Sequence, residues 1–106
     1  MTASTQDLAA ERLNAIPPRE LEQAILRRLR ARRAGASICP SEVARELAGD
    51  TTWRLFMQPV RDAASRLRER GELETLQRGR PVDPLTVRGP IRLRLPAFVS
   101  PEPYET

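Results

Sequence analysis

Apolar residues recur with helical spacing in two stretches of the first half of the sequence. The first begins at Pro18, where a proline in the opening turn sacrifices no hydrogen bond, and ends before Gly35. The second begins at Pro40 and ends at Gly49. Because apolar residues three and four positions apart share one side of a helix, each stretch predicts an amphipathic helix with a face for a core.

A third helical stretch spans residues 53–70 and carries a strong apolar stripe. The stripe consists of Phe56, Val60, Ala63, Ala64 and Leu67. Pro59 lacks a backbone donor, which predicts a division near Gln58 into a short turn and a main helix. The tight connection at residues 49–52 joins this stretch to the preceding helix in a helix-turn-helix arrangement.

Alternation of apolar and polar residues replaces the helical pattern after Gly71. Residues 72–77 and 91–95 are each predicted to form a strand, and the two strands to pair as a hairpin. Residues 36–38 are too short for an independent strand but can pair at the edge of the sheet. The connection at residues 78–90 is rich in glycine and proline, which is typical of a loop projecting from a small sheet. The order of elements predicts a mainly α protein with a small antiparallel β-hairpin, an α+β winged helix-turn-helix fold.

The length of 106 residues allows one compact domain that folds without disulfides or metals. We place this domain at residues 18–95. Residues 1–17 are predicted to form an arm or a short helix, and the proline-rich residues 96–106 a tail without regular structure.

The residue types present exclude most familiar catalytic and cofactor chemistries. Histidine is absent and Cys39 is the single cysteine, so zinc sites, Cys-His pairs and Ser-His-Asp triads lack their partners. The carboxylates form no convincing catalytic pair, and no glycine-rich phosphate loop occurs. We therefore expect no enzymatic activity and no metal or cofactor, and we interpret Cys39 as a chemically quiet, partly buried residue.

The start of the sequence lacks the charged and apolar regions of a signal peptide. No apolar run reaches the length that spans a membrane. We therefore expect a cytoplasmic protein that does not enter a membrane.

The eighteen basic residues, all arginine, outnumber fourteen acidic ones and give a net charge of +4. A basic domain of this size is compatible with a polyanionic partner. The exclusive use of arginine has two interpretations: a GC-rich genome, or a surface that uses the planar guanidinium to bind phosphate or guanine. The composition does not decide between these two interpretations.

One face of the third helical stretch carries polar side chains at helical spacing. These are Arg54, Gln58, Arg61, Ser65 and Arg68. Such side chains bind phosphates and base edges in a major groove, so this face is a predicted DNA-contacting surface. The alternative is an ordinary solvated helix in which Asp62 and Arg66 form an i,i+4 ion pair. Trp53 is interpreted as covering the core rather than stacking on a base.

Arginines also gather at residues 78–90 and in the strand that follows. Arg78, Arg80 and Arg88 lie in the loop, and a basic wing of this kind contacts a minor groove or the phosphate backbone. The alternative is a loop that folds back on the domain, with Asp83 tying down an arginine.

Several segments resemble a bacterial family known as domain of unknown function 3253. They are residues 38–44, the Trp53-Arg54 pair followed by Met57, Val60 and Arg61, and residues 77–84 and 89–94. The most specific part is the run Gln-Arg-Gly-Arg-Pro-Val-Asp-Pro at residues 77–84. The resemblance covers about residues 20–95 and implies a winged-helix-like fold. It implies no established activity, ligand or catalytic residue.

These patterns support two functional hypotheses. The first is a module that binds double-stranded DNA, with transcriptional regulation as a candidate role, through the arginines and polar residues named above. The second is a non-catalytic protein-interaction module on the same scaffold. A continuous basic face would favour the first, whereas arginines neutralised by carboxylates or an exposed apolar patch would favour the second. The oligomeric state, the target sequence and the protein partner are not determined by these patterns.

Overall fold

The structure is a computed structural model and describes residues 15–96. The expected arm at residues 1–17 and the expected tail at residues 96–106 lie outside the described residues except for their inner ends. Both expectations therefore stay predictions.

Three α-helices form one layer of the domain: α2 (Pro18–Arg30), α3 (Pro40–Ala48) and α4 (Met57–Glu69). As predicted, α2 and α3 each begin at a proline. At the start of α3 the Glu42 carboxylate accepts a hydrogen bond from the backbone N–H of Cys39, at 2.9 Å. This contact satisfies an amide that the helix itself cannot pair, and so fixes where α3 starts.

The third helical stretch is divided, as the sequence predicts, but earlier than Gln58. A short 3-10 helix, η1 (Trp53–Phe56), runs directly into α4 at Met57. Pro59 is thereby placed in the first turn of α4, where the missing N–H would have had no helical partner. The proline thus limits how far upstream α4 can extend without bending it.

A four-stranded antiparallel sheet forms the second layer. It consists of β1 (Ser37–Ile38), β2 (Glu74–Gln77), β3 (Arg80–Pro81) and β4 (Arg92–Arg94), in the spatial order β1-β4-β2-β3. The predicted hairpin is β2 paired with β4, and the predicted edge strand is β1 paired with β4. The short β3, which the alternation pattern did not indicate, adds a second edge next to β2.

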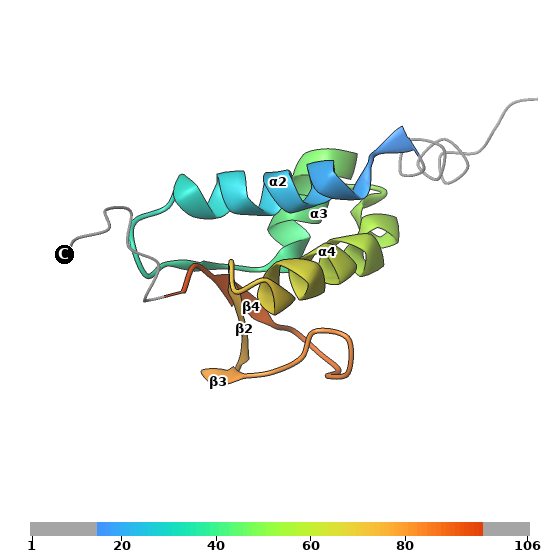
Figure 1. Ribbon diagram of the computed structural model, residues 1–106. Helices are drawn as coiled ribbons and strands as arrows, with labels where there is room; N and C mark the ends of the chain where they lie inside the picture. Colours follow the sequence, from blue (N-terminus) through green and yellow to red (C-terminus); the bar gives the residue numbers. More distant parts are fainter. Residues whose placement is uncertain (1–14, 97–106) are drawn as a thin grey trace, which may run out of the picture.

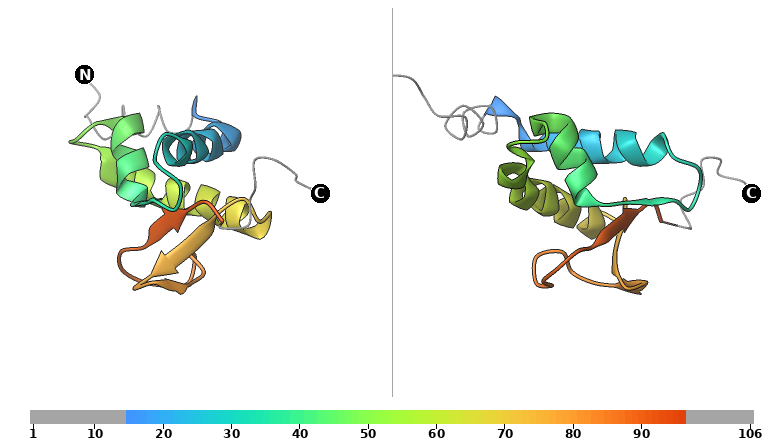
Figure 2. Two further views of the ribbon diagram at one scale, coloured as in Figure 1. Left: turned by 90° about the vertical axis from the view of Figure 1, so that its left-hand side faces the viewer. Right: turned by 180° about the vertical axis from the view of Figure 1, so that it is seen from behind.

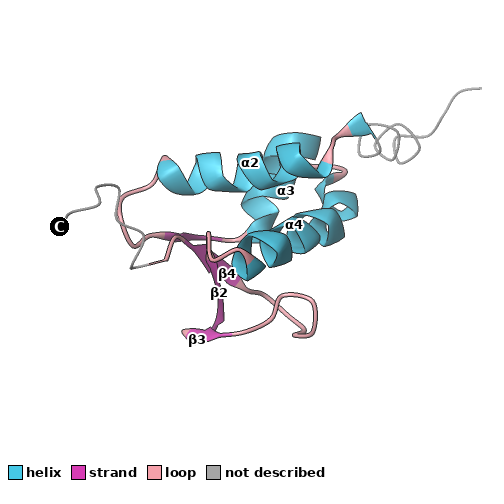
Figure 3. Cartoon of the chain, in the orientation of Figure 1, coloured by secondary structure: helices cyan, strands magenta, loops and turns pink. Residues whose placement is uncertain are grey.

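Within residues 15–96 the fold is therefore α+β, with three α-helices and a small antiparallel sheet, and it is compatible with the predicted winged helix. The helices lie together on one side, and the sheet with its long connection lies on the other (Figures 1 and 2). Figure 3 shows that most of the connection at residues 78–90 has no regular structure. We call residues 78–90 the wing loop. No helix within residues 15–96 is long and apolar enough to cross a membrane.

The core lies between the two layers, and α4 is central to it. This helix contacts α2, α3 and β2. The residues of its apolar stripe are fully buried, and so are Ile25 of α2 and Leu93 of β4. Burying a side chain as large as Val60, Leu67 or Phe56 contributes about 1.5–3 kcal/mol, which makes this packing the main source of stability.

Ion pairs join α4 to α2. The carboxylate of Glu22 accepts from the guanidinium groups of Arg66 and Arg70, at 2.5 and 2.7 Å. The alternative in which Asp62 pairs with Arg66 along α4 is thus wrong, because Arg66 is directed across the helix interface instead. Burial of Glu22 opposes ionisation, but the hydrogen bonds from both arginines outweigh it and lower the pKa of Glu22.

A second network joins α2 to α3. Glu42 pairs with Arg28 and Arg32, and Glu46 pairs with Arg27 and Arg28. Burial of Glu42 opposes its ionisation, but the N–H of Cys39 and the nearby arginines outweigh burial and lower the pKa of Glu42. The carboxylates of α3 are therefore part of the helix packing and not isolated surface charges.

We expect the stability of the domain to fall in acid because of Glu22 and Glu42. Their pKa values are lowered by folding, so their contribution is present above the ordinary value of about 4.5 and is lost as the pH falls through the folded pKa. Replacing both with glutamine should lower Tm at pH 7 by roughly 5 °C and flatten its pH dependence below pH 5. Thermal unfolding followed by circular dichroism from pH 7 to pH 3 measures both effects.

Glu69→Gln is the matched control, because Glu69 is exposed and has no ion pair among the described residues. An equally steep loss of Tm in acid for the double variant and this control would contradict the assignment.

Candidate nucleic-acid interface

The predicted polar face of α4 is only partly available to a ligand. Ser65 is 5% exposed, so the expectation that it lies on an open face is wrong. Of the residues of α4, Gln58, Arg68 and Glu69 are exposed, and the others are buried or half-buried. Gln58 is exposed, but its amide group donates to the Asp62 carboxylate at 2.9 Å.

Two arginines of this face, Arg54 and Arg68, are exposed and have no carboxylate partner among the described residues. Arg54 lies over the Trp53 ring, 4.6 Å from its centroid, and Arg45 lies over the same ring at 4.5 Å. Trp53 is half-buried against the core, as expected, and its ring contacts cations instead of offering a free stacking surface.

Arg61, the fifth residue of the predicted face, turns toward the wing loop. Its guanidinium donates to the carbonyl oxygens of Pro84, Val87 and Gly89, at distances of 3.1 to 3.3 Å. A planar guanidinium has donors on several sides, so it can hold three carbonyls at once. Arg61 therefore fixes the wing loop to α4, and its donors are occupied within the protein.

The wing loop also has internal hydrogen bonds. A carboxylate oxygen of Asp83 accepts from the N–H of Leu85 at 2.9 Å, and its carbonyl accepts from the N–H groups of Thr86 and Val87 at 3.2 Å. Thr75 of β2 donates from its hydroxyl to the carbonyl of Val82. The alternative of a folded-back loop is thus correct in outline, but Arg61 holds it, and Asp83 binds backbone amides rather than an arginine.

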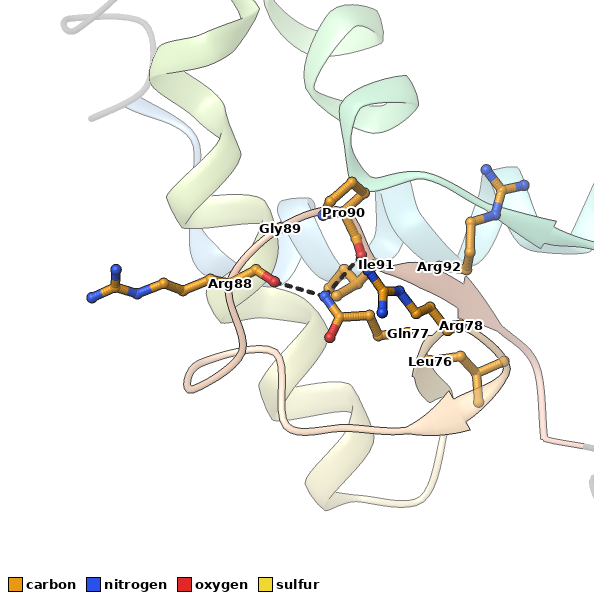
Figure 4. A pocket seen from close by; sticks show the side chains of 8 residues that line it. All are labelled: Leu76, Gln77, Arg78, Arg88, Gly89, Pro90, Ile91 and Arg92. Atoms are coloured by element: carbon orange, nitrogen blue, oxygen red, sulfur yellow. Dashed lines mark hydrogen bonds between the residues drawn. The ribbon is translucent and has the colours of Figure 1, made fainter.

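The two ends of the wing loop are joined by Gln77. Its amide group donates to the carbonyls of Arg88 and Pro90, at 2.6 and 3.2 Å (Figure 4). A groove of about 540 Å³ lies along this contact. The residues that line it are Leu76, Gln77, Arg78, Arg88, Gly89, Pro90, Ile91 and Arg92. In Figure 4 the side chain of Arg88 extends away from the rest of the lining.

The tip between β2 and β3 is a two-residue turn. Gln77 pairs with Arg80, and the intervening Arg78 and Gly79 have φ angles of +53° and +79°. Positive φ at both central positions is typical of a type I′ turn, where asparagine and glycine are preferred. Arg78 is the only non-glycine residue with positive φ within residues 15–96. The left-handed backbone there costs roughly 1 kcal/mol.

The arginines of the wing loop are unpaired, whereas many elsewhere are not. Arg78, Arg80 and Arg88 are exposed, and the described residues offer their guanidinium groups no hydrogen bond, ion pair or ring contact. Six other arginines within residues 15–96 form salt bridges: Arg27, Arg28, Arg32, Arg66, Arg70 and Arg94. The wing loop thus has three free cations against a single carboxylate, Asp83.

The charge of the described part of the chain is higher than that of the whole. Residues 15–96 contain seventeen of the eighteen arginines and ten of the fourteen carboxylates, which gives +7 against +4 for the full sequence. Within the same residues, no group of three Cys, Asp or Glu side chains is placed to hold a metal ion. The free guanidinium groups of the wing loop are cationic donors of the kind that suits anions.

Sequence reasoning missed the roles of Gln77 and Arg61 in building this surface. Gln77 carries a usable signal, since it directly precedes an Arg-Gly pair whose glycine permits a tight turn. Arg61 carries none, because the carbonyls that it contacts lie 23 to 28 residues away in the sequence.

Residues 18–96 match the family described as protein of unknown function DUF3253. Because this match covers most of the chain, the protein belongs to that family. A comparison with curated proteins gives no match.

We expect Arg61→Ala to release the wing loop from α4. Loss of the hydrogen bonds to three carbonyls should lower the free energy of unfolding by about 1–2 kcal/mol. The amides of Thr86 and Val87 should also exchange faster with solvent, because the turn that protects them is no longer held. Chemical denaturation and hydrogen exchange by NMR measure these effects.

Arg68→Ala serves as the control, since it removes the same charge from an exposed position of α4. If both variants protect Thr86 and Val87 as the wild type does, Arg61 is not what holds the loop.

Proposed function

We propose that this domain binds double-stranded DNA and that the wing loop is its main contact. The observation that carries the proposal is the set of free arginines in the loop, Arg78, Arg80 and Arg88, on a backbone held by Arg61 and Gln77. Free guanidinium groups bind phosphates and release counterions from DNA, which supplies most of the affinity of such interfaces.

The polar face of the third helical stretch contributes less to the proposed interface than the sequence suggests. Of the five polar residues on its predicted face, Arg54 and Arg68 keep guanidinium groups that no carboxylate neutralises. They extend the positive charge beyond the wing loop. Arg61 acts as a positioning residue, because its donors are directed at the loop.

Binding to a fluorescent random-sequence duplex should be micromolar or tighter and should weaken steeply as salt rises. Arg80→Ala and Arg88→Ala should each weaken it several-fold at all sequences and should reduce the slope of log K against log salt by about 1. Fluorescence anisotropy at several salt concentrations measures this, with a single strand of equal charge and heparin as comparators.

The matched controls are Arg19→Ala and Arg30→Ala. Both residues are exposed on α2, in the layer opposite the wing loop, and neither has a partner among the described residues (Figure 1). Equal losses from the α2 variants and the wing variants would show non-specific attraction by net charge. Equal affinity for the duplex and the comparators would reject the proposal.

A protein-interaction module is the second candidate, and the exposed leucines favour it. Leu55 in η1 is 40% exposed and Leu85 in the wing loop is 53% exposed. Both are large apolar side chains that a partner surface would cover. Absence of duplex binding would direct the search to this function, with Leu85→Ser as the variant to compare in a partner screen.

A further inference from the structure

We infer that the turn at Arg78 and Gly79 enters the minor groove of DNA and that Arg78 gives the domain a preference for narrow, A·T-rich segments. This inference rests on the proposed DNA binding and goes beyond it, because it names the groove, the residue and the class of sequence.

The first step is that α4 is poorly equipped to recognise base edges in the major groove. The donors of Arg61 are used by the wing loop, Ser65 is buried, and the amide of Gln58 is bound to Asp62. Direct recognition there requires free donors and acceptors aimed at base edges. Only Arg54 and Arg68 keep unneutralised guanidinium groups on this face, whereas all three arginines of the wing loop are free.

The second step is the shape and exposure of the tip. The turn has only two residues, and a Cβ atom placed on Gly79 would meet nothing within 4 Å. In Figures 1 and 2 the end of the hairpin near β3 projects on the side of the sheet away from the helices. A narrow tip with open space around it suits a groove about 6 Å wide.

The third step is the choice of residue at the strained position. Asparagine would occupy the left-handed conformation of Arg78 at lower cost, so the turn alone does not call for arginine. Strained backbone of this kind points to function when the surrounding structure holds it in place. Here the pairing of Gln77 with Arg80 and the amide contacts of Gln77 hold it.

The fourth step is chemical complementarity. The floor of the minor groove offers acceptors at A·T pairs, whereas a G·C pair adds an amino donor that repels a guanidinium. A·T tracts also narrow the groove and strengthen its negative potential, which attracts inserted arginines. The Arg78 side chain has donors only and forms no ion pair within residues 15–96, and Arg80 follows on the other side of the turn for the flanking phosphates.

The test compares the full chain on two hairpin duplexes of equal length, one with a central A·T tract and one with alternating G·C pairs. We expect the A·T duplex to bind roughly tenfold more tightly. A ligand that fills the minor groove of A·T tracts should displace the protein, and a ligand confined to the major groove should not.

Arg78→Asn is the informative variant, because asparagine suits the turn and preserves the fold while removing the cation. It should bind both duplexes equally, whereas the control Arg30→Ala should keep the A·T preference. An unchanged Tm for Arg78→Asn confirms that lost preference is not lost structure.

The outcomes separate the two proposals. Equal binding of both duplexes by the wild type, or an A·T preference that survives Arg78→Asn, overturns the minor-groove assignment and leaves DNA binding intact. Absence of binding to either duplex overturns both. Tighter binding to double-stranded RNA also overturns the assignment, since the minor groove of RNA is wide and shallow.

Discussion

The guanidinium of Arg61 fixes the geometry on which the candidate interface depends. It spans from α4 to three carbonyls of the wing loop, which without it would have no contact of this kind to the helical layer. Five residues of this loop are proline or glycine, and such a segment has few ladder hydrogen bonds of its own. The side chain of Arg61, which has several donors, takes the place of those ladder hydrogen bonds. The wing loop therefore has a defined conformation, even though most of it has no regular secondary structure.

Because α4 supplies both the core and this anchor, several of its polar side chains are not available to a ligand. Its apolar stripe faces α2 and the sheet, Arg66 is committed to Glu22, and Arg61 is committed to the loop. Arginines in this protein thus have two uses. Some on or next to the helices, such as Arg28, Arg66 and Arg70, pair with carboxylates of a neighbouring helix, and each such pair contributes modestly. Those on the wing loop all keep guanidinium groups that are free to bind anions.

The stability of the helical layer and the charge of the wing loop are therefore separate properties. The carboxylates that pair with arginine lie on α2, α3, β2 and the turn before β2, as Glu22, Glu42 and Glu72 illustrate. The only acidic residue of the wing loop, Asp83, binds backbone amides and helps to shape the turn. The positive potential of the loop is consequently not cancelled by its own sequence.

The sequence by itself determined the helices, the paired strands and the α+β class, because apolar periodicity and proline and glycine positions are local signals. It also determined that arginines gather at residues 53–70 and 78–90. Only the tertiary structure decided which arginines are free, that Ser65 is buried, and that Arg66 pairs with Glu22, 44 residues away. The physical reason is that a polar side chain at a given helical spacing can face solvent, a neighbouring helix or a distant loop. Packing, and not spacing, selects among them.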